Sequence, residues 1–166
     1  MTREAALFIM VALLAVALLL MWRGWRRRTG RYSHLPELLD ATALQTGPTA
    51  SFSVFYVATT EANQPLERVV RRPLGYRAKI DLGVSAEGIW LDIPGEGSFH
   101  IPRSLTFGLG QATWTIDRVV DPDQLVFVRW RWGDLAVDSY FRSVDYPAQE
   151  IIQALSGATN SKEDDQ

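Results

Sequence analysis

The sequence predicts a mainly β protein in which an N-terminal transmembrane helix precedes a barrel or roll of about seven strands and a C-terminal helix. Three observations support this fold class. An apolar run extends from Ala5 to Trp22, residues from about 51 to 142 alternate apolar and polar side chains, and apolar side chains recur with helical spacing after Asp145. We expect four regions: an anchor with an arginine-rich flank at 1–31, a juxtamembrane linker at 32–49, a β domain at 50–156 and a disordered acidic tail at 157–166.

The apolar run has the length and composition of a transmembrane helix. About 18 residues give a helix of roughly 27 Å, which matches the hydrocarbon core of a bilayer, and the run contains no charged residue, Pro or Gly. A buried core helix would carry a polar stripe. A cleaved signal peptide carries its basic residues before the apolar run and a small-residue cleavage site after it. Here the basic residues follow the run, so we interpret it as an uncleaved anchor.

The basic residues after the run set the expected orientation. Only Arg3 and the amino terminus supply positive charge before it, and basic residues stay on the cytoplasmic side of a membrane. The N-terminus is therefore expected outside the cell and residues 23–166 inside, in a single-pass protein of the cell membrane. The residues expected to flank the membrane are Trp22, Arg23, Trp25, Arg26, Arg27, Arg28 and Arg31.

Composition restricts the partners of the β domain. Residues 32–166 contain 11 basic and 18 acidic side chains, a formal net charge of −7. Such a charge opposes binding to nucleic acid and to anionic lipid. We therefore expect no nucleic-acid partner, no specific lipid headgroup and only weak binding of the domain to anionic vesicles. The chain has no Cys, which excludes a disulfide framework and suits a reducing compartment.

The domain begins after a short connector. Leu35–Leu44 has helical spacing and ends at a Gly-Pro break. Ser51–Thr60 is expected to be the first strand, with Phe52, Val54 and Tyr56 on one face.

Further alternating segments predict the central strands. The four-residue connection from Ser85 to Gly88 is typical of a hairpin, because Gly88 can supply the positive φ that closes such a turn. Ile80, Leu82 and Val84 are expected to face inward, and Lys79 and Asp81 outward. The expected strands are Arg77–Val84, Ile89–Ile93, Ser98–Ile101 and one within about Leu105 to Val119, most clearly Thr113–Asp117.

The last hairpin allows a register to be predicted. Gln124–Trp132 and Leu135–Arg142 flank Gly133 and Asp134, which fit a two-residue turn with Gly in the first central position. In this register apolar side chains oppose apolar ones and opposite charges meet. The predicted pairs are Trp132 with Leu135, Trp130 with Val137, Arg129 with Asp138, Phe127 with Tyr140 and Val126 with Phe141.

The final element is expected to be an amphipathic helix. Asp145 is the expected N-cap, with Pro147 in the first turn. The apolar face is formed by Ala148, Ile151, Ile152 and Leu155. Such a helix can cover the open end of a barrel.

Several short strings carry a family resemblance: Tyr56–Thr60, Pro65–Val69, Tyr76–Ile80, Gly88–Leu91, Ile101–Pro102, Ile116–Val120 and Val137–Tyr140. Together with the order of strands and helix, they resemble a pleckstrin-homology-like (PH-like) domain. More closely, the chain resembles a family of small actinobacterial membrane proteins with one N-terminal helix and a cytoplasmic PH-like domain. The resemblance implies no agreed catalytic residue. Members have been labelled transporters or export proteins, and one helix alone could serve such a role only as an accessory part.

The strongest candidate binding group is basic. In eukaryotic PH domains the corresponding loop and strand hold basic residues that bind inositol phosphates. Here the alternatives are an anion or partner surface and a solvated strand face whose charges protect a sheet edge. The group consists of Arg71, Arg72, Arg77 and Lys79.

For three other features, a structural interpretation is an alternative to a functional one. The loop Pro65–Pro73 either docks a partner or folds over the barrel mouth. The acidic residues Asp117, Asp121 and Asp123 fit a turn better than a cation site. Six aromatic residues are expected in the core rather than along a ligand groove: Trp90, Trp114, Phe127, Trp130, Trp132 and Tyr140.

An enzyme is not expected. The two histidines, His34 and His100, lie far apart in the sequence, and there is no Cys nucleophile, metal-binding histidine pair, G-x-S-x-G motif or P-loop. We expect no cofactor and no metal. The leading hypothesis is a membrane-anchored PH-like interaction module that presents a protein-binding surface at the inner face of the membrane. The alternative is an accessory subunit of a membrane transport or export complex.

Overall fold

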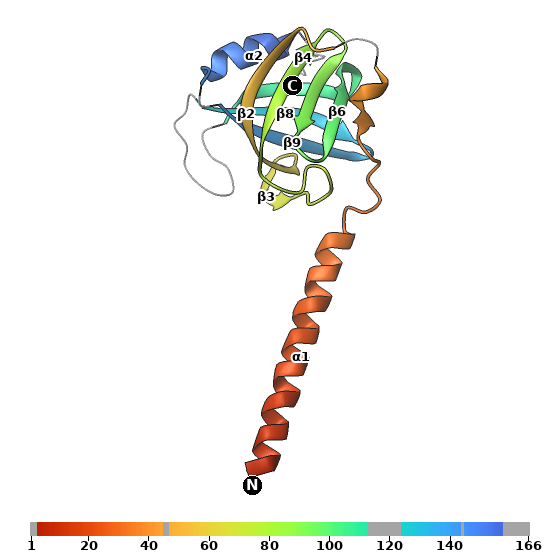
Figure 1. Cartoon of the computed structure of the whole chain (residues 1–166), viewed down its shortest axis with the longest axis vertical. Helices are drawn as coiled ribbons and strands as arrows, with labels where there is room; N and C mark the ends of the chain where they lie inside the picture. The colour runs from red at the N-terminus through yellow and green to blue at the C-terminus, as the bar shows by residue number, and fades with distance from the viewer. Residues whose placement is uncertain (1–2, 45–46, 113–123, 144, 158–166) are drawn as a thin grey trace. The chain divides into compact units, whose positions relative to one another are not determined.

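The computed structural model describes residues 3–44, 47–112, 124–143 and 145–157 (Figure 1). The chain divides into two compact units, Met1–His34 and Leu35–Gln166. The first unit holds one long helix, and the second holds every strand that the structure describes.

Helix α1 spans Arg3–Gly30. Within it, the 21 residues Leu7–Arg27 are long and apolar enough to cross a membrane, and none of this stretch is buried in the protein. Among the described residues no other helix meets that test. The predicted apolar helix is therefore confirmed.

The second unit is one antiparallel sheet curled into an open barrel (Figure 1). The strands follow the order β1-β6-β5-β4-β2-β9-β8-β7, and β3 pairs with β2 alone. β2, β4 and β6 face β8 and β9 across the core in Figure 1. The strands are β1 Leu39–Asp40, β2 Ala50–Glu61, β3 Gln64–Arg68, β4 Ala78–Ser85, β5 Gly88–Ile93, β6 Gly97–Pro102, β7 Thr106–Gln111, β8 Leu125–Trp132 and β9 Leu135–Arg142.

The core of the barrel follows the alternation predicted from the sequence. Side chains that face inward from β2, β4 and β5 are almost completely buried, as at Val54, Leu82 and Leu91. Each such side chain contributes roughly 1.5–3 kcal/mol through burial. Lys79 and Asp81, which alternate with them along β4, are exposed as expected.

The predicted register of the last hairpin is confirmed in all five pairs. Gly133 at the turn has φ of +64°, the conformation that this turn requires of its first central residue. Across the strands, Asp138 accepts two hydrogen bonds from Arg129, at 2.7 Å to Nε and 2.9 Å to Nη2.

The described residues form nine strands, two more than the count of about seven that the sequence predicts. Leu39 and Asp40 form β1, which pairs with β6. A single 3-10 turn, η1 at Ala41–Ala43, follows it, so the helical interpretation of Leu35–Leu44 was wrong. β3 was missed because its five residues include Pro65 and three polar side chains, which hide the strand period. The predicted strand at Thr113–Asp117 lies outside the described residues.

Helix α2 spans Ala148–Ser156 and packs against β7 and β8. Ala148, Ile151 and Leu155 are buried, whereas Ile152 is half-buried. The predicted N-cap was wrong, because Pro147 occupies that position and makes no side-chain cap. The entry to the helix is fixed instead by the backbone N–H of Tyr146, which donates to Ser143 Oγ at 3.0 Å.

Candidate functional site

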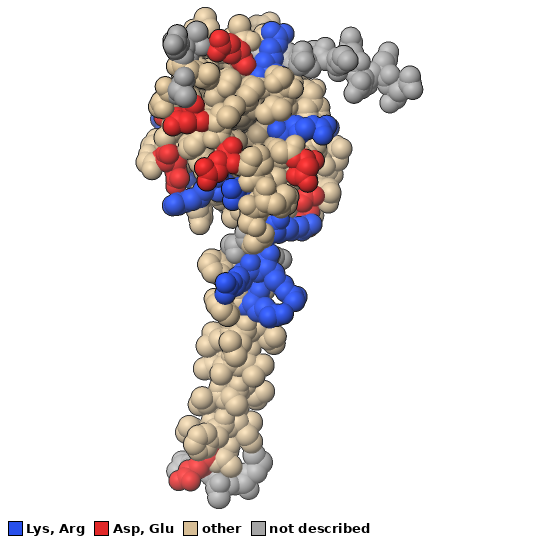
Figure 2. All heavy atoms as spheres, turned by 90° about the vertical axis from the view of Figure 1, so that its right-hand side faces the viewer, with Lys and Arg blue, Asp and Glu red and all other residues tan. Residues whose placement is uncertain are grey.

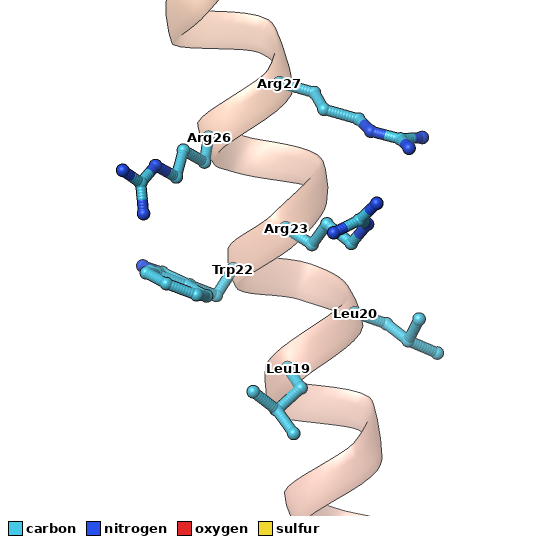
Figure 3. A pocket seen from close by; sticks show the side chains of 6 residues that line it. All are labelled: Leu19, Leu20, Trp22, Arg23, Arg26 and Arg27. Atoms are coloured by element: carbon cyan, nitrogen blue, oxygen red, sulfur yellow. The ribbon is translucent and has the colours of Figure 1, made fainter.

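The residues predicted to flank the membrane lie on the last turns of α1, except Arg31, which follows the end of the helix at Gly30. Figure 3 shows four of them, Trp22, Arg23, Arg26 and Arg27. Trp22, Arg23, Trp25, Arg26 and Arg27 are exposed. The Arg26 guanidinium lies 5.4 Å from the centroid of the Trp22 ring, a cation–π distance. The hollow between these side chains belongs to the surface of one helix, so it is not an enclosed cavity. Figure 2 shows the gathering of basic side chains at this end of the helix.

The predicted basic group is divided in the structure. Arg71 and Arg72 line a hollow of about 330 Å³, whereas Arg77 and Lys79 do not line it. Three carboxylates share that hollow, and Arg72 Nη2 lies 3.4 Å from Glu96 Oε1. Because these carboxylates oppose the field of the two arginines, the hollow offers an anion little net attraction. An anion or partner surface built from all four basic residues stays a prediction. The acidic lining residues are Glu37, Asp40 and Glu96.

The loop expected at Pro65–Pro73 is partly a strand and partly a cover over one end of the barrel. Val69 and Leu74 are fully buried, and the Tyr56 hydroxyl donates to the Leu74 carbonyl at 2.8 Å. Leu66, on β3, is 77% exposed. The buried residues show that the loop folds against the barrel, and Leu66 leaves an apolar side chain on its outer surface.

Most of the aromatic set is core, as expected. Trp130 and Trp132 are buried and stack with ring centroids 5.3 Å apart. Their indole N–H groups donate to Ser139 Oγ and to the Pro36 carbonyl. Tyr140 and Phe127 belong to a second, smaller apolar cluster with Val57, Ala58 and Leu125. Trp114 lies outside the described residues, as do Asp117, Asp121 and Asp123.

Trp90 is also buried, with 9% of its surface exposed, but unlike these tryptophans it lines a groove on the outer face of the sheet. The groove has a volume of about 320 Å³ and lies between strands β2, β4, β5 and β6 and the segment that follows β1. We call it the Trp90 groove. Its lining residues are Ala41, Thr42, Pro48, Ser51, Asp81, Gly83, Trp90, Leu91, Asp92 and Ser98.

The walls of the Trp90 groove are held by hydrogen bonds and close packing. Trp90 Nε1 donates to Ser85 Oγ at 3.2 Å, and the His100 ring lies 5.3 Å from the Trp90 ring. A Cβ at Gly83 would lie 2.7 Å from Pro48 Cβ, so only glycine lets Pro48 approach the sheet. The Thr49 N–H donates to the Val84 carbonyl at 2.7 Å and fixes this wall.

Two carboxylates lie side by side in the Trp90 groove. Asp81 and Asp92 are direct partners across β4 and β5, on the same face as Trp90. Ser98 Oγ donates to Asp92 Oδ1 at 2.8 Å. The sequence held a signal for this pair, because the two-residue turn after Ser85 places Asp81 opposite Asp92. The wall formed by Pro48 had no local signal, since it depends on a contact between distant segments.

The buried polar groups form structural contacts in the core. The Tyr56 hydroxyl, which donates to the Leu74 carbonyl, lies 2.9 Å from Thr59 Oγ1, and Thr59 Oγ1 lies 2.7 Å from Ser139 Oγ. Burial raises the pKa of the Tyr56 hydroxyl, so this group stays protonated and serves as a donor. Burial also lowers the pKa of His100, and nearby Glu87 only partly opposes that effect.

No metal centre is evident in the part of the chain that the structure describes. No group there brings together three or more His, Cys, Asp or Glu side chains that could hold an ion. Two carboxylates with one aromatic ring and apolar walls, as in the Trp90 groove, better suit an organic cation than a metal ion.

A curled antiparallel sheet followed by a C-terminal helix is the architecture of a PH-like domain. The chain belongs to the bacterial PH domain-like family, whose model matches residues 33–156. The match begins before β1 and ends at the last residue of α2. A comparison with curated proteins found no match.

Proposed function

We propose that this protein is a membrane-anchored interaction module whose PH-like domain presents a protein-binding surface at the inner face of the cell membrane. The proposal rests on two features that occur together in this chain, a helix with a basic end and a PH-like domain. A helix able to cross a membrane ends in a cluster of arginines, and a PH-like domain begins within a few residues of it. The arginines favour a cytoplasmic position for that domain.

The surface of the domain favours a protein partner over a lipid headgroup. Residues 32–166 carry a formal net charge of −7, which repels anionic membranes. Figure 2 shows acidic and basic side chains interspersed on one face of the domain, without a large basic patch. A domain that is already tethered also gains little attachment from a headgroup site, because a spanning helix anchors far more strongly.

A binding role fits the chemistry of the described residues better than catalysis. PH-like domains are generally non-catalytic, and the buried hydroxyl groups of Tyr56, Thr59 and Ser139 bond to one another in the core rather than in an open cleft. The concave features at the surface combine a few polar groups with apolar walls, which is typical of recognition sites.

Exchange of the anchor tests this proposal directly. Residues 1–31 would be replaced by an unrelated single-span anchor of the same orientation, and partners would be crosslinked in native membranes. We expect the same crosslinked partners with both anchors, because the domain does the binding. A mutated domain on the native anchor serves as the control and should lose them. Loss of the partners with the exchanged anchor alone would instead indicate an accessory subunit of a transport or export complex, recognised through its helix.

A further inference from the structure

We propose that the Trp90 groove binds an arginine or lysine side chain of a partner protein. This inference rests on the proposed interaction role and assigns it a place on the domain. Three observations support it: a pair of carboxylates without a cation, an indole ring held beside them, and a hollow of suitable size and polarity.

The carboxylate pair lacks a counter-charge. Asp81 and Asp92 are directly opposed on neighbouring strands, where like charges destabilise a sheet. Among the described residues neither forms an ion pair. Lys79 lies two residues from Asp81 on the same face of β4, yet no ion pair joins them in the described structure. A guanidinium or ammonium group between the two carboxylates would relieve their repulsion.

The hydrogen bonds in the groove leave a carboxylate oxygen available to accept from a guanidinium or ammonium group. Ser98 occupies Oδ1 of Asp92, and no described donor occupies Oδ2. The groove therefore presents ordered acceptors, and a guanidinium is the side-chain group that donates to carboxylates most effectively.

The remaining walls fit the aliphatic part of a long basic side chain. Trp90 is 9% exposed, and the accessible part of its ring lies two residues from Asp92, where a cation can interact with it. Pro48, which is exposed, adds apolar surface. A volume of about 320 Å³ lies at the lower end of known ligand sites. These features favour one inserted side chain over a large organic ligand, and the acidic domain favours a basic segment as its source.

Fluorine NMR can test this assignment on the full-length chain. The protein would be labelled with 5-fluorotryptophan and placed in nanodiscs of zwitterionic lipid, and the Trp90 signal would be identified by its loss in Trp90→Phe. The probe is the blocked tripeptide acetyl-Gly-Arg-Gly-amide, and its control has Gln in place of Arg. We expect the arginine probe to shift the Trp90 signal in a saturable, salt-sensitive manner, and the Gln probe to leave it unchanged.

Matched charge variants locate the site. Asp81→Asn and Asp92→Asn should each weaken binding of the arginine probe by about tenfold, the effect of one lost charge-assisted hydrogen bond. Asp145→Asn removes the same charge from an exposed position outside the groove and should leave binding within about twofold. Both groove variants should unfold at the same temperature as the wild type or a higher one, because each removes one of two adjacent negative charges.

Two results would overturn the assignment. The first is an absent or non-saturable shift with the arginine probe, which the wild-type protein alone can reveal even if an Asn variant is unstable. The second is equal weakening by Asp145→Asn and the groove variants, which would mean general attraction to an acidic domain. If the probe fails while anchor exchange still preserves crosslinked partners, the interaction role stands and its surface lies elsewhere.

Discussion

At the scale of single residues, the two members of the Arg129–Asp138 ion pair differ in burial. Arg129 Nε lies 2.7 Å from Asp138 Oδ1, and the side chains are 28% and 5% exposed, respectively. Arg129 also donates to Asn63 Oδ1, at the turn between β2 and β3. The hydrogen bond with Asp138 raises the pKa of Arg129, so the guanidinium stays charged.

We predict different costs for removing the two partners. Arg129→Met leaves a buried carboxylate unpaired and should lower the free energy of unfolding by about 3 kcal/mol. Asp138→Asn keeps the shape and leaves an arginine that can reach water, so it should cost about 1–2 kcal/mol. Urea unfolding of the full-length chain in detergent micelles measures both values. A larger cost for Asp138→Asn would contradict the burial seen here.

His100 should make stability depend on pH. It is buried, its Nε2 has no hydrogen-bond partner in the described structure, and its pKa is lowered by burial. The unfolded chain therefore binds a proton more readily than the folded chain below about pH 6.5. The contribution of His100 to stability is complete above that pH and decreases as the pH falls, by at most about 1.4 kcal/mol per pH unit.

The His100→Gln variant tests this pH dependence. Its free energy of unfolding should change less between about pH 6.5 and 5 than that of the wild type. His34→Gln, at an exposed position, is the matched control and should keep the wild-type slope. If the free energy of unfolding changed equally with pH in the wild type and in His100→Gln, the pKa of His100 would be the same in the folded and unfolded states.

At the scale of elements, α2 depends on one buried stripe. Ile151 is completely buried and Ile152 is half-buried. Ile151→Asp should therefore lower the free energy of unfolding by about 3 kcal/mol or more, because it buries an unpaired charge. Ile152→Asp should cost about 1 kcal/mol, since its carboxylate can reach solvent. Thermal unfolding compares them, and a greater loss for Ile152→Asp would mean that the helix is rotated from the position described here.

The elements that could be predicted from sequence are those whose local pattern decides their structure. In β4, β5, β8 and β9, alternation sets the buried face, and the two-residue turns set the register. β1 was not predictable in this way, because two residues carry no period and the strand exists only through its pairing with β6.

The same distinction explains what was and was not predicted of the candidate site. Asp81 was expected to face outward, and it does. The Trp90 groove could not be predicted, because one wall requires Pro48 to pack on Gly83. The placement of Arg71 and Arg72 beside Glu96 likewise depends on two connections that meet only in the fold. Both features arise from contacts between segments distant in the sequence.

At the scale of the whole molecule, the unit that begins at Leu35 contains its own core and nearly all of the family match, which spans residues 33–156. Removal of residues 1–31 should therefore leave a soluble domain that unfolds in one cooperative transition. A dispersed two-dimensional ¹H–¹⁵N spectrum and a sharp thermal transition would support this expectation. A collapsed spectrum without cooperative unfolding would show that the domain needs its anchor to fold.

Cysteine labelling of the full-length chain in intact cells tests the membrane-anchored arrangement most directly. The chain has no Cys, so Thr29→Cys and Ser161→Cys each introduce one reactive site, and Thr2→Cys marks the other end. With a membrane-impermeant maleimide, we expect labelling at position 2 in intact cells, and at positions 29 and 161 only after lysis. The labelled protein should keep its full mass of 18.7 kDa. Labelling at 29 and 161 in intact cells, or loss of the N-terminal segment by cleavage, would contradict a cytoplasmic interaction module held by an uncleaved helix.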